Sequence, residues 1–293
     1  MRCREGALTL APPPLACDDE PVTSSTPPSH RSAWSAEGRP GPDGRVVGVL
    51  LSHGFTGSPV SIRPWAEHFA AEGYAVSVPQ LPGHGTRWQD MVPTRYADYR
   101  EAVDRAFADL RDRCDAVVVG GLSMGGCLTL ELAARRSEEV AGVVVVNAAV
   151  ASTNKQLKAL PVLKHLLPAF PGIGNDIKAG GDEGGYAKTP LRALDSMVRA
   201  WPEVRAALPQ VTCPVLVFRS VEDHVVDPSS ARIILDSVGT DDAREVLLHD
   251  SWHVATLDND APQIFRESLE FVQRVTGRDR RGTDEHDVGR RTR

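Results

Sequence analysis

The chain has 293 residues, of which 41% are hydrophobic and 25% charged, and its formal net charge at pH 7 is -6. A chain of this length and hydrophobicity can bury one large core, and its charges are spread along the sequence without a basic patch. The composition indicates a soluble globular protein and argues against a nucleic-acid partner, because phosphate binding needs concentrated Lys and Arg.

The five cysteines are scattered, odd in number and without the spacing of a metal site. This pattern argues against a disulfide framework and against a zinc site, and it favours a reducing, cytoplasmic location. Residues 7–17 resemble a signal peptide only in part, because three prolines interrupt an apolar run that is too short. No stretch reaches the apolar length of a membrane span, so we expect no stable membrane insertion.

Proline, serine, glycine and charged residues crowd residues 1–44 without an apolar period, and we expect a disordered arm there. One ordered domain is predicted for residues 45–276. The mixed charges of residues 277–293 predict a flexible tail. Both a monomer and a homodimer are compatible with this organisation.

Within the domain, short β-rich apolar runs alternate with amphipathic helical segments. The predicted strands are 46–51, 74–78, 116–119, 143–146, 215–218 and 245–248. The predicted helices are about 62–73, 96–110, 124–136, 229–238 and 261–275. This alternation predicts an α/β fold in which helices cover both faces of a mostly parallel sheet.

Residues from about 150 to 208 interrupt the alternation. They hold no clear strand, but they contain many apolar side chains, a glycine-rich loop at 180–185 and a helical stretch at 190–199. An insertion between two strands, placed where a lid would cover the strand ends, accounts for this pattern. We expect Leu163, Leu167 and Phe170 of this cap to contact substrate, although anchoring the cap to the sheet would also use apolar residues.

Residues 121–126, Gly-Leu-Ser-Met-Gly-Gly, follow a predicted strand and open a predicted helix. In this G-x-S-x-G context a serine lies on a tight turn, and its neighbours are small because a Cβ would collide with adjacent elements. Ser123 is therefore the candidate nucleophile, although a glycine-rich turn can also serve packing alone. The loop after the first strand of the domain can supply an oxyanion-hole donor, and the best candidates are the backbone amides of Phe55 and Met124.

A serine nucleophile needs an imidazole base and a carboxylate that orients the base. Asp223 and His253 each lie just past a predicted strand, where open α/β sheets place their sites, and the chain order Ser, Asp, His suits this architecture. His249 is a less favoured base because it would still belong to its strand end. Glu222 and Asp227 compete with Asp223, but Asp227 precedes a proline at a helix start, where capping is expected.

Two further histidines, His53 and His84, lie in glycine-rich turns after the first two strands. Bracing these turns through hydrogen bonds is favoured over a catalytic role for either residue. The sequence has no paired carboxylates for glycosidic chemistry, no phosphate-cradling loop and no dinucleotide fingerprint.

From about residue 46 to residue 275, the sequence resembles the bacterial carboxylesterase and monoacylglycerol lipase group of the α/β-hydrolase superfamily. The motifs that carry the resemblance are H-G-F-T-G-S at 53–58, P-G-H-G at 82–85, G-L-S-M-G-G at 121–126 and H-V-A-T-L-D at 253–258. The resemblance implies an α/β-hydrolase fold with a small cap and no cofactor. Its implied site is the triad Ser123, Asp223 and His253 with the oxyanion amides of Phe55 and Met124.

Trp252 stands where this group often has glycine before the catalytic histidine. A tryptophan there would narrow the mouth of the site, so we count it among the substrate-contacting residues. The implied activity is cleavage of carboxylic esters through an acyl-enzyme, with short to medium acyl esters or monoacylglycerols as small-molecule substrates.

Three other functions compete with ester hydrolysis. Thioester cleavage or acyl transfer could use the same triad, since a thiol ester can donate and an alcohol can accept the acyl group. A non-catalytic binding protein is disfavoured because such relatives usually lose a triad member. Dehalogenase and epoxide hydrolase chemistry is disfavoured because those relatives carry Asp at the position of Ser123.

Overall fold

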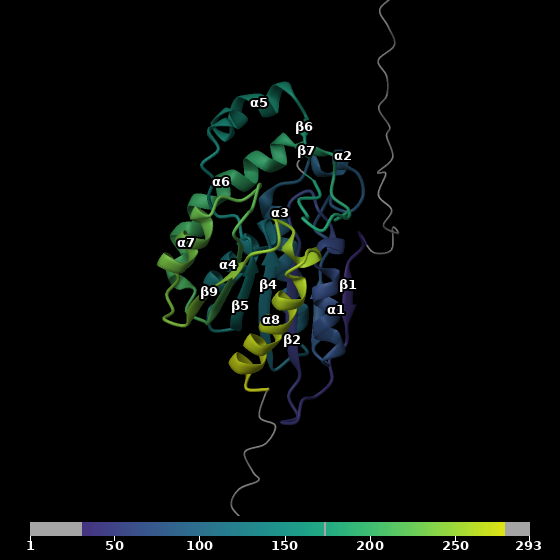
Figure 1. Ribbon diagram of the computed structural model, residues 1–293, viewed down its shortest axis with the longest axis vertical. Helices are drawn as coiled ribbons and strands as arrows, with labels where there is room; N and C mark the ends of the chain where they lie inside the picture. Colours follow the sequence, from purple (N-terminus) through teal and green to yellow (C-terminus); the bar gives the residue numbers. More distant parts are fainter. Residues whose placement is uncertain (1–30, 173, 279–293) are drawn as a thin grey trace, which may run out of the picture.

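A seven-stranded sheet forms the centre of the computed structural model, which describes residues 31–172 and 174–278 (Figure 1). Every neighbouring pair in the order β1-β3-β2-β4-β5-β8-β9 is parallel except β1 and β3. The strands are β1 (Trp34–Ala36), β2 (Val47–Ser52), β3 (Ala75–Val78), β4 (Ala116–Leu122), β5 (Val140–Val146), β8 (Val215–Ser220) and β9 (Ala243–Leu248). This sheet confirms the predicted fold class and brings the carboxyl ends of six strands to one edge.

The strands at the centre of the sheet are rich in β-branched residues and are buried on both faces. In β4, Val117 and Val119 pack into one hydrophobic layer, whereas Val118 and Leu122 pack into the other. Side chains alternate between the two faces of a strand, so an uninterrupted apolar run fills both layers. Helices must therefore cover the sheet on both sides.

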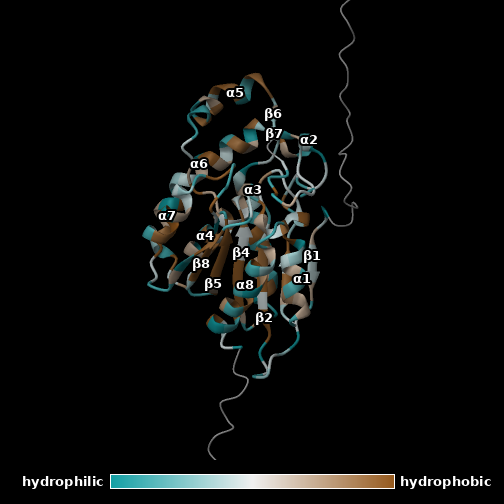
Figure 2. Cartoon of the chain, in the orientation of Figure 1, coloured by the Kyte–Doolittle hydropathy of each residue, from teal (hydrophilic) through white to brown (hydrophobic). Residues whose placement is uncertain are grey.

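Five helices provide this cover. On one face, α1 (Arg63–Ala71) and α8 (Ala261–Thr276) lie side by side, and on the other lie α3 (Tyr96–Arg111), α4 (Met124–Arg135) and α7 (Ser229–Ser237) (Figure 1). Figure 2 shows the resulting pattern, with hydrophobic strands inside and hydrophilic colour on the outer side of α8. Shorter connecting elements are η2 (Pro59–Ile62), α2 (Trp88–Met91), η4 (Leu208–Gln210) and η5 (Ala255–Leu257).

The segment between β5 and β8 lies over the carboxyl ends of the strands as a cap (Figure 1). Its elements are η3 (Lys155–Ala159), α5 (Leu160–Leu166), β6 (Ala169–Pro171), β7 (Lys188–Pro190) and α6 (Leu191–Ala207). β6 and β7 pair as an antiparallel ribbon where the sequence predicts no strand, because three-residue strands are too short to show a period of two. α6 extends past its predicted end at residue 199, because buried residues recur at helical spacing through Trp201 and Val204.

The prediction that residues 1–44 form a disordered arm is wrong for β1. Trp34 to Ala36 pair antiparallel with β3, and the guanidinium of Arg63 lies 4.4 Å from the centre of the Trp34 ring. A strand of three residues is too short to show an alternation of apolar and polar residues. This edge strand forms by pairing with β3, a partner that the sequence does not reveal. Residues 1–30 of the predicted arm and residues 279–293 of the predicted tail lie outside the described residues.

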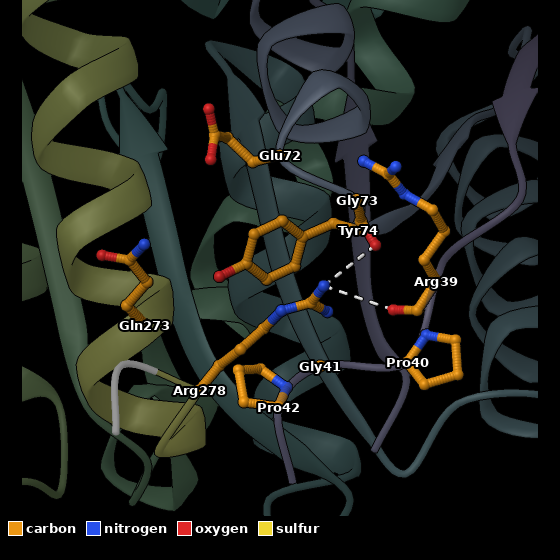
Figure 3. Close-up of a pocket in the computed structure, with 9 residues that line it drawn as sticks. All are labelled: Arg39, Pro40, Gly41, Pro42, Glu72, Gly73, Tyr74, Gln273 and Arg278. Atoms are coloured by element: carbon orange, nitrogen blue, oxygen red, sulfur yellow. Dashed lines mark hydrogen bonds between the residues drawn. The ribbon is translucent and has the colours of Figure 1, made fainter. Parts of the chain in front are cut away.

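A clamp at the amino ends of the strands joins the two ends of the described chain (Figure 3). Arg278 donates hydrogen bonds to the carbonyl oxygens of Arg39 at 3.2 Å and Gly73 at 3.1 Å, and its guanidinium lies 4.3 Å from the Tyr74 ring centre. The hollow around it has a volume of about 260 Å³. Since Arg278 is engaged with backbone and ring, we interpret this hollow as a packing feature of the chain ends.

Candidate active site

Ser123 lies on the sharp turn between β4 and α4. Its backbone has φ 57° and ψ -119°, a left-handed conformation that is strained for a residue with a Cβ. The turn is held by a hydrogen bond from Ser123 N–H to the Val146 carbonyl at 2.9 Å. A Cβ on Gly125 would overlap the carbonyl oxygen of Ser52, so the small residues after Ser123 let α4 approach β2. The turn brings the hydroxyl to the carboxyl edge of the sheet.

His253 and Asp223 come from two loops at the same edge and contact each other. His253 Nδ1 lies 2.9 Å from Asp223 Oδ2, and the two side chains are only 9% and 6% exposed. The other oxygen of Asp223 accepts hydrogen bonds from the N–H groups of Val225 and Val226, both at 2.8 Å. The carboxylate is therefore fixed by its own loop and can hold the imidazole with Nδ1 protonated.

Asp223 and His253 each shift the pKa of the other. Burial opposes ionisation of Asp223, but the His253 ring and two backbone amides outweigh burial and lower the pKa of Asp223. Burial alone would also lower the pKa of His253. The hydrogen bond to Asp223 and the negative charges of Asp223, Glu183 and Asp176 outweigh burial, and the pKa of His253 lies above the ordinary value of 6.5.

The alternative residues make other contacts than the Asp223–His253 pair, although Asp227 lines the same cavity as that pair. His249 is exposed and follows the last residue of β9 directly. Glu222 lies 3.5 Å from His224, not against the buried imidazole. Asp227 accepts a hydrogen bond from the N–H of Ser229, the first residue of α7, at 2.9 Å, as expected for a carboxylate at a helix start.

The loop after β2 passes close to Ser123. A Cβ on Gly54, the residue before Phe55, would stand 3.4 Å from the Cβ of Ser123. Met124 is the first residue of α4, and its N–H therefore has no acceptor within the helix. Both residues are thus placed beside Ser123, at the loop and at the helix N-terminus respectively.

His53 and His84 brace the turns that carry this loop. His53 is fully buried, its Nδ1 lies 2.9 Å from the Gly54 carbonyl oxygen, and its Nε2 accepts a hydrogen bond from Leu81 N–H at 3.3 Å. Burial lowers the pKa of His53 to about 4 despite the Gly54 hydrogen bond, so the ring is neutral. The ring of His84 stands edge-on to that of His53 at 5.1 Å. These contacts agree with the predicted bracing role.

A cavity of about 590 Å³ opens between the sheet edge and the cap. Ser123, Asp223 and His253 all line it, together with Phe55 of the loop after β2. Most of its apolar wall comes from the cap, through Leu157, Leu160, Phe170, Leu191, Leu194, Met197 and Trp201. The volume is that of a typical small-molecule site.

Of the four residues predicted to contact substrate, Phe170 lines the cavity, whereas Leu163, Leu167 and Trp252 are not among the residues that line it. α5 turns Leu160 inward, and its other apolar residues lie to the side or face solvent, so that Leu166 is 71% exposed. The Trp252 ring packs edge-on against His224 at 4.9 Å, outside the cavity.

The sequence interpretation missed the contribution of α6 and of two acids in the preceding loop. Leu191, Leu194 and Met197 recur at three-residue intervals along α6, a signal that the sequence does contain. Asp176 and Glu183 also line the cavity, but the glycine-rich loop that holds them has no period from which their direction could be predicted.

Neither metal nor disulfide chemistry is indicated by the residues that the structure describes. They contain no cluster of three or more His, Cys, Asp or Glu residues suited to a metal ion. Cys114, Cys127 and Cys213 are buried free thiols, while Cys3 and Cys17 lie outside the described residues. No helix in residues 31–172 or 174–278 is both long enough and apolar enough to cross a bilayer.

Comparisons with known proteins agree with this geometry. The chain is 42% identical over 233 residues to the thermostable monoacylglycerol lipase of a Bacillus species, a match that covers 79% of this chain and 92% of that protein. It is 27% identical over 235 residues to the carboxylesterase of Bacillus subtilis, covering 78% and 92% of the two chains. Among solved structures, one described as "LipS and LipT, two metagenome-derived lipolytic enzymes" matches with a TM-score of 0.79 at 39% identity and covers 84% of this chain and 98% of its own.

A family model with the description "Alpha/beta hydrolase family" matches residues 49–276, which include the turn at Ser123, both loops of the Asp223–His253 pair and the whole cap. The sheet order, the strained serine turn and this match lead to one conclusion. The chain belongs to the alpha/beta hydrolase family.

Proposed function

We propose that this protein hydrolyses carboxylic esters, with Ser123 as nucleophile, His253 as general base and Asp223 as the acid that orients the base. The observation that carries the proposal is the buried Asp223–His253 hydrogen bond in the same cavity as a serine on a strained strand-to-helix turn. A serine hydroxyl is a weak nucleophile by itself, and a neutral imidazole can accept its proton as it attacks.

The hydrogen bond between Asp223 and His253 supports one proton path. Because Asp223 accepts a hydrogen bond from Nδ1–H of His253, the unprotonated nitrogen of the neutral ring is Nε2, which accepts the Ser123 proton. Ser123 Oγ bonds to the ester carbonyl carbon, and the imidazolium then protonates the departing alcohol. In the second half of the reaction, water attacks the acyl-enzyme and gives a proton to Nε2, and the imidazolium then returns this proton to Ser123 Oγ as the carboxylic acid leaves.

The negative charge on the tetrahedral oxygen needs donors in place before the reaction. The N–H of Met124 points from the start of α4, and the N–H of Phe55 belongs to the loop that packs against Ser123. Backbone donors fixed by secondary structure require little reorganisation as charge develops, and each such donor is typically worth about 10²- to 10³-fold in kcat. We assign these two amides to the oxyanion hole.

The cavity suits a substrate with an acyl chain and a small polar alcohol. Leu160, Leu194 and Met197 belong to its apolar wall, whereas Asp176 and Glu183 place carboxylates near the base. Apolar walls bind an acyl chain, with about 0.8 kcal/mol for each buried methylene, and the carboxylates can accept hydrogen bonds from alcohol hydroxyls. Together with the relatives described as a monoacylglycerol lipase and a carboxylesterase, this favours monoacylglycerols and short to medium acyl esters.

The test combines labelling with a substrate panel. Ser123→Ala should abolish both labelling by a fluorophosphonate and hydrolysis of p-nitrophenyl esters, and Ser237→Ala at the end of α7 is the matched control. The panel should add monoacylglycerols and triacylglycerols of graded chain length. Labelling that persists in Ser123→Ala would disprove the nucleophile, and a preference for triacylglycerol emulsions would disprove the substrate class.

A further inference from the structure

The backbone at and on either side of His253 is held by two acids, Asp176 and Asp258, that take no part in the proposed proton transfers. The N–H of His253 donates to Asp176 Oδ2 at 3.1 Å, and the N–H of Val254 donates to the Asp176 carbonyl at 3.0 Å. The N–H of Trp252 donates to Asp258 Oδ2 at 2.9 Å. Three consecutive amides are therefore fixed, two of them by a residue of the cap loop.

The carbonyl groups of the same segment are held from the sheet. Asn147 Nδ2 donates to the His253 carbonyl at 2.8 Å, and Ser220 Oγ donates to the Trp252 carbonyl at 2.8 Å. Asn147 is itself fixed, because its Oδ1 accepts a hydrogen bond from Ser220 N–H at 2.8 Å and its φ is 46°. The segment around His253 is therefore held by Asn147 and Ser220 at the ends of sheet strands and by Asp176 of the cap loop.

Asp258, the last residue of the H-V-A-T-L-D motif, connects the segment around His253 to the cap loop. Besides Trp252 it accepts hydrogen bonds from the N–H groups of Lys178 at 2.7 Å, Ala179 at 2.9 Å and Asn259 at 2.9 Å. Burial opposes ionisation of Asp258, but these four amides outweigh burial and lower its pKa. A carboxylate with four backbone donors ties the base loop firmly to residues 178 and 179 of the cap.

We propose that Asp176 and Asp258 are positioning residues, through which the cap loop at 176–179 completes the setting of the catalytic base. The inference rests on the proposed function of His253. Proton transfer is sensitive to position, since a displacement of about 1 Å can cost roughly 10²-fold in rate. Neither carboxylate oxygen needs to touch the substrate for this role.

The acid limb of the pH profile tests this role, because it responds to charges near His253 and a change in loop stability alone would not shift it. The charged groups that act on His253 are Asp223 after β8 and Glu183 and Asp176 in the cap loop. The titratable group beside Asp176 is His224, whose Nδ1 lies 2.8 Å from Asp176 Oδ1. Asp176→Asn keeps an acceptor oxygen but removes a negative charge, so the acid limb of the pH profile should move to lower pH.

The experiment measures kcat, KM and the pH profile on a short p-nitrophenyl ester, for which the acyl wall matters little. Asp176→Ala and Asp258→Ala should each lower kcat by about 10²-fold with KM changed less than about threefold. Asp260→Ala is the matched control, because the Asp260 carboxylate accepts the backbone N–H of Asp250 in the same loop, whereas the amides of residues 252, 253, 178 and 179 donate to Asp176 or Asp258. It should stay within about threefold of the parent protein.

Wild-type kcat in folded Asp176→Ala and Asp258→Ala would overturn the proposal, and so would an equal loss in Asp260→Ala. If the alanine variants fail to fold by circular dichroism, the acid limb of Asp176→Asn decides, since an unmoved limb shows that Asp176 does not act on the base and refutes its role. A parent protein that cleaves no ester would instead refute the proposed function, which keeps the two failures separate.

Discussion

Asp223→Asn is the sharpest perturbation of the proposed triad, because it changes the charge and leaves the shape. In the folded protein one oxygen of Asp223 accepts from the N–H groups of Val225 and Val226. The Asn Oδ1 can keep both of these hydrogen bonds. Its Nδ2 then faces His253 Nδ1, where the carboxylate accepts a hydrogen bond at 2.9 Å.

This substitution reverses the tautomer of the His253 imidazole. An amide NH₂ can only donate, so Nδ1 becomes the acceptor and the ring proton moves to Nε2, which can no longer accept the serine proton. The wrong tautomer in an otherwise intact triad costs about 10⁴-fold in kcat, which corresponds to about 5.4 kcal/mol. Since Asp223 is 6% exposed, water cannot easily replace the lost carboxylate.

The assay is kcat on a short p-nitrophenyl ester, with the melting temperature as a check on folding. Asp227→Asn is the control from the same loop, since its carboxylate accepts from Ser229 N–H and lies at a helix start. It should lose at most about 1 kcal/mol of stability and little activity. Equal losses in the two variants, or more than about 1% of the activity in Asp223→Asn, would refute the tautomer argument.

Three further predictions concern the pKa of His253, the close packing at Gly125 and the apolar wall at Leu194. Since the acids around His253 raise its pKa and only the neutral ring accepts a proton, kcat/KM should fall on the acid side with a midpoint above 6.5, and a flat profile below pH 6 would contradict this. Gly125→Ala places a Cβ on the Ser52 carbonyl oxygen, so it should cost at least about 1–3 kcal/mol of stability, measured by denaturant unfolding, along with activity. Leu194→Trp should shorten the acyl slot and lower kcat/KM for longer esters by about fourfold per excluded methylene, while p-nitrophenyl acetate turnover is retained. Leu166→Trp on the exposed side of the cap is its control, and chain-length profiles that match in the two variants would contradict the assigned wall.

Local pattern in the sequence was enough to predict six of the seven strands of the sheet, its covering helices and the position of the serine turn. Buried strands such as β4 and β5 are uninterrupted valine-rich runs, and helices such as α3 show apolar residues at steps of three and four. The G-x-S-x-G segment is also local, because its glycines are required by atoms of the turn and of the adjoining strand. Asp223 and His253 followed from their places after strands, since parallel strands end at one edge of a sheet.

Tertiary packing decided the features that depend on distant partners. The three-residue strands β1, β6 and β7 form only through pairing, and three residues are too few to show the alternation that predicts a strand. Which cap residues face the cavity depended on the rotation of α5, and this turned Leu166 to solvent and left the wall to Leu194 and Met197. The contact of Asp176 with the backbone of His253 spans 77 residues. Such a contact is set by where the cap docks on the sheet, because the burial that docks it is a property of two surfaces and not of either segment alone.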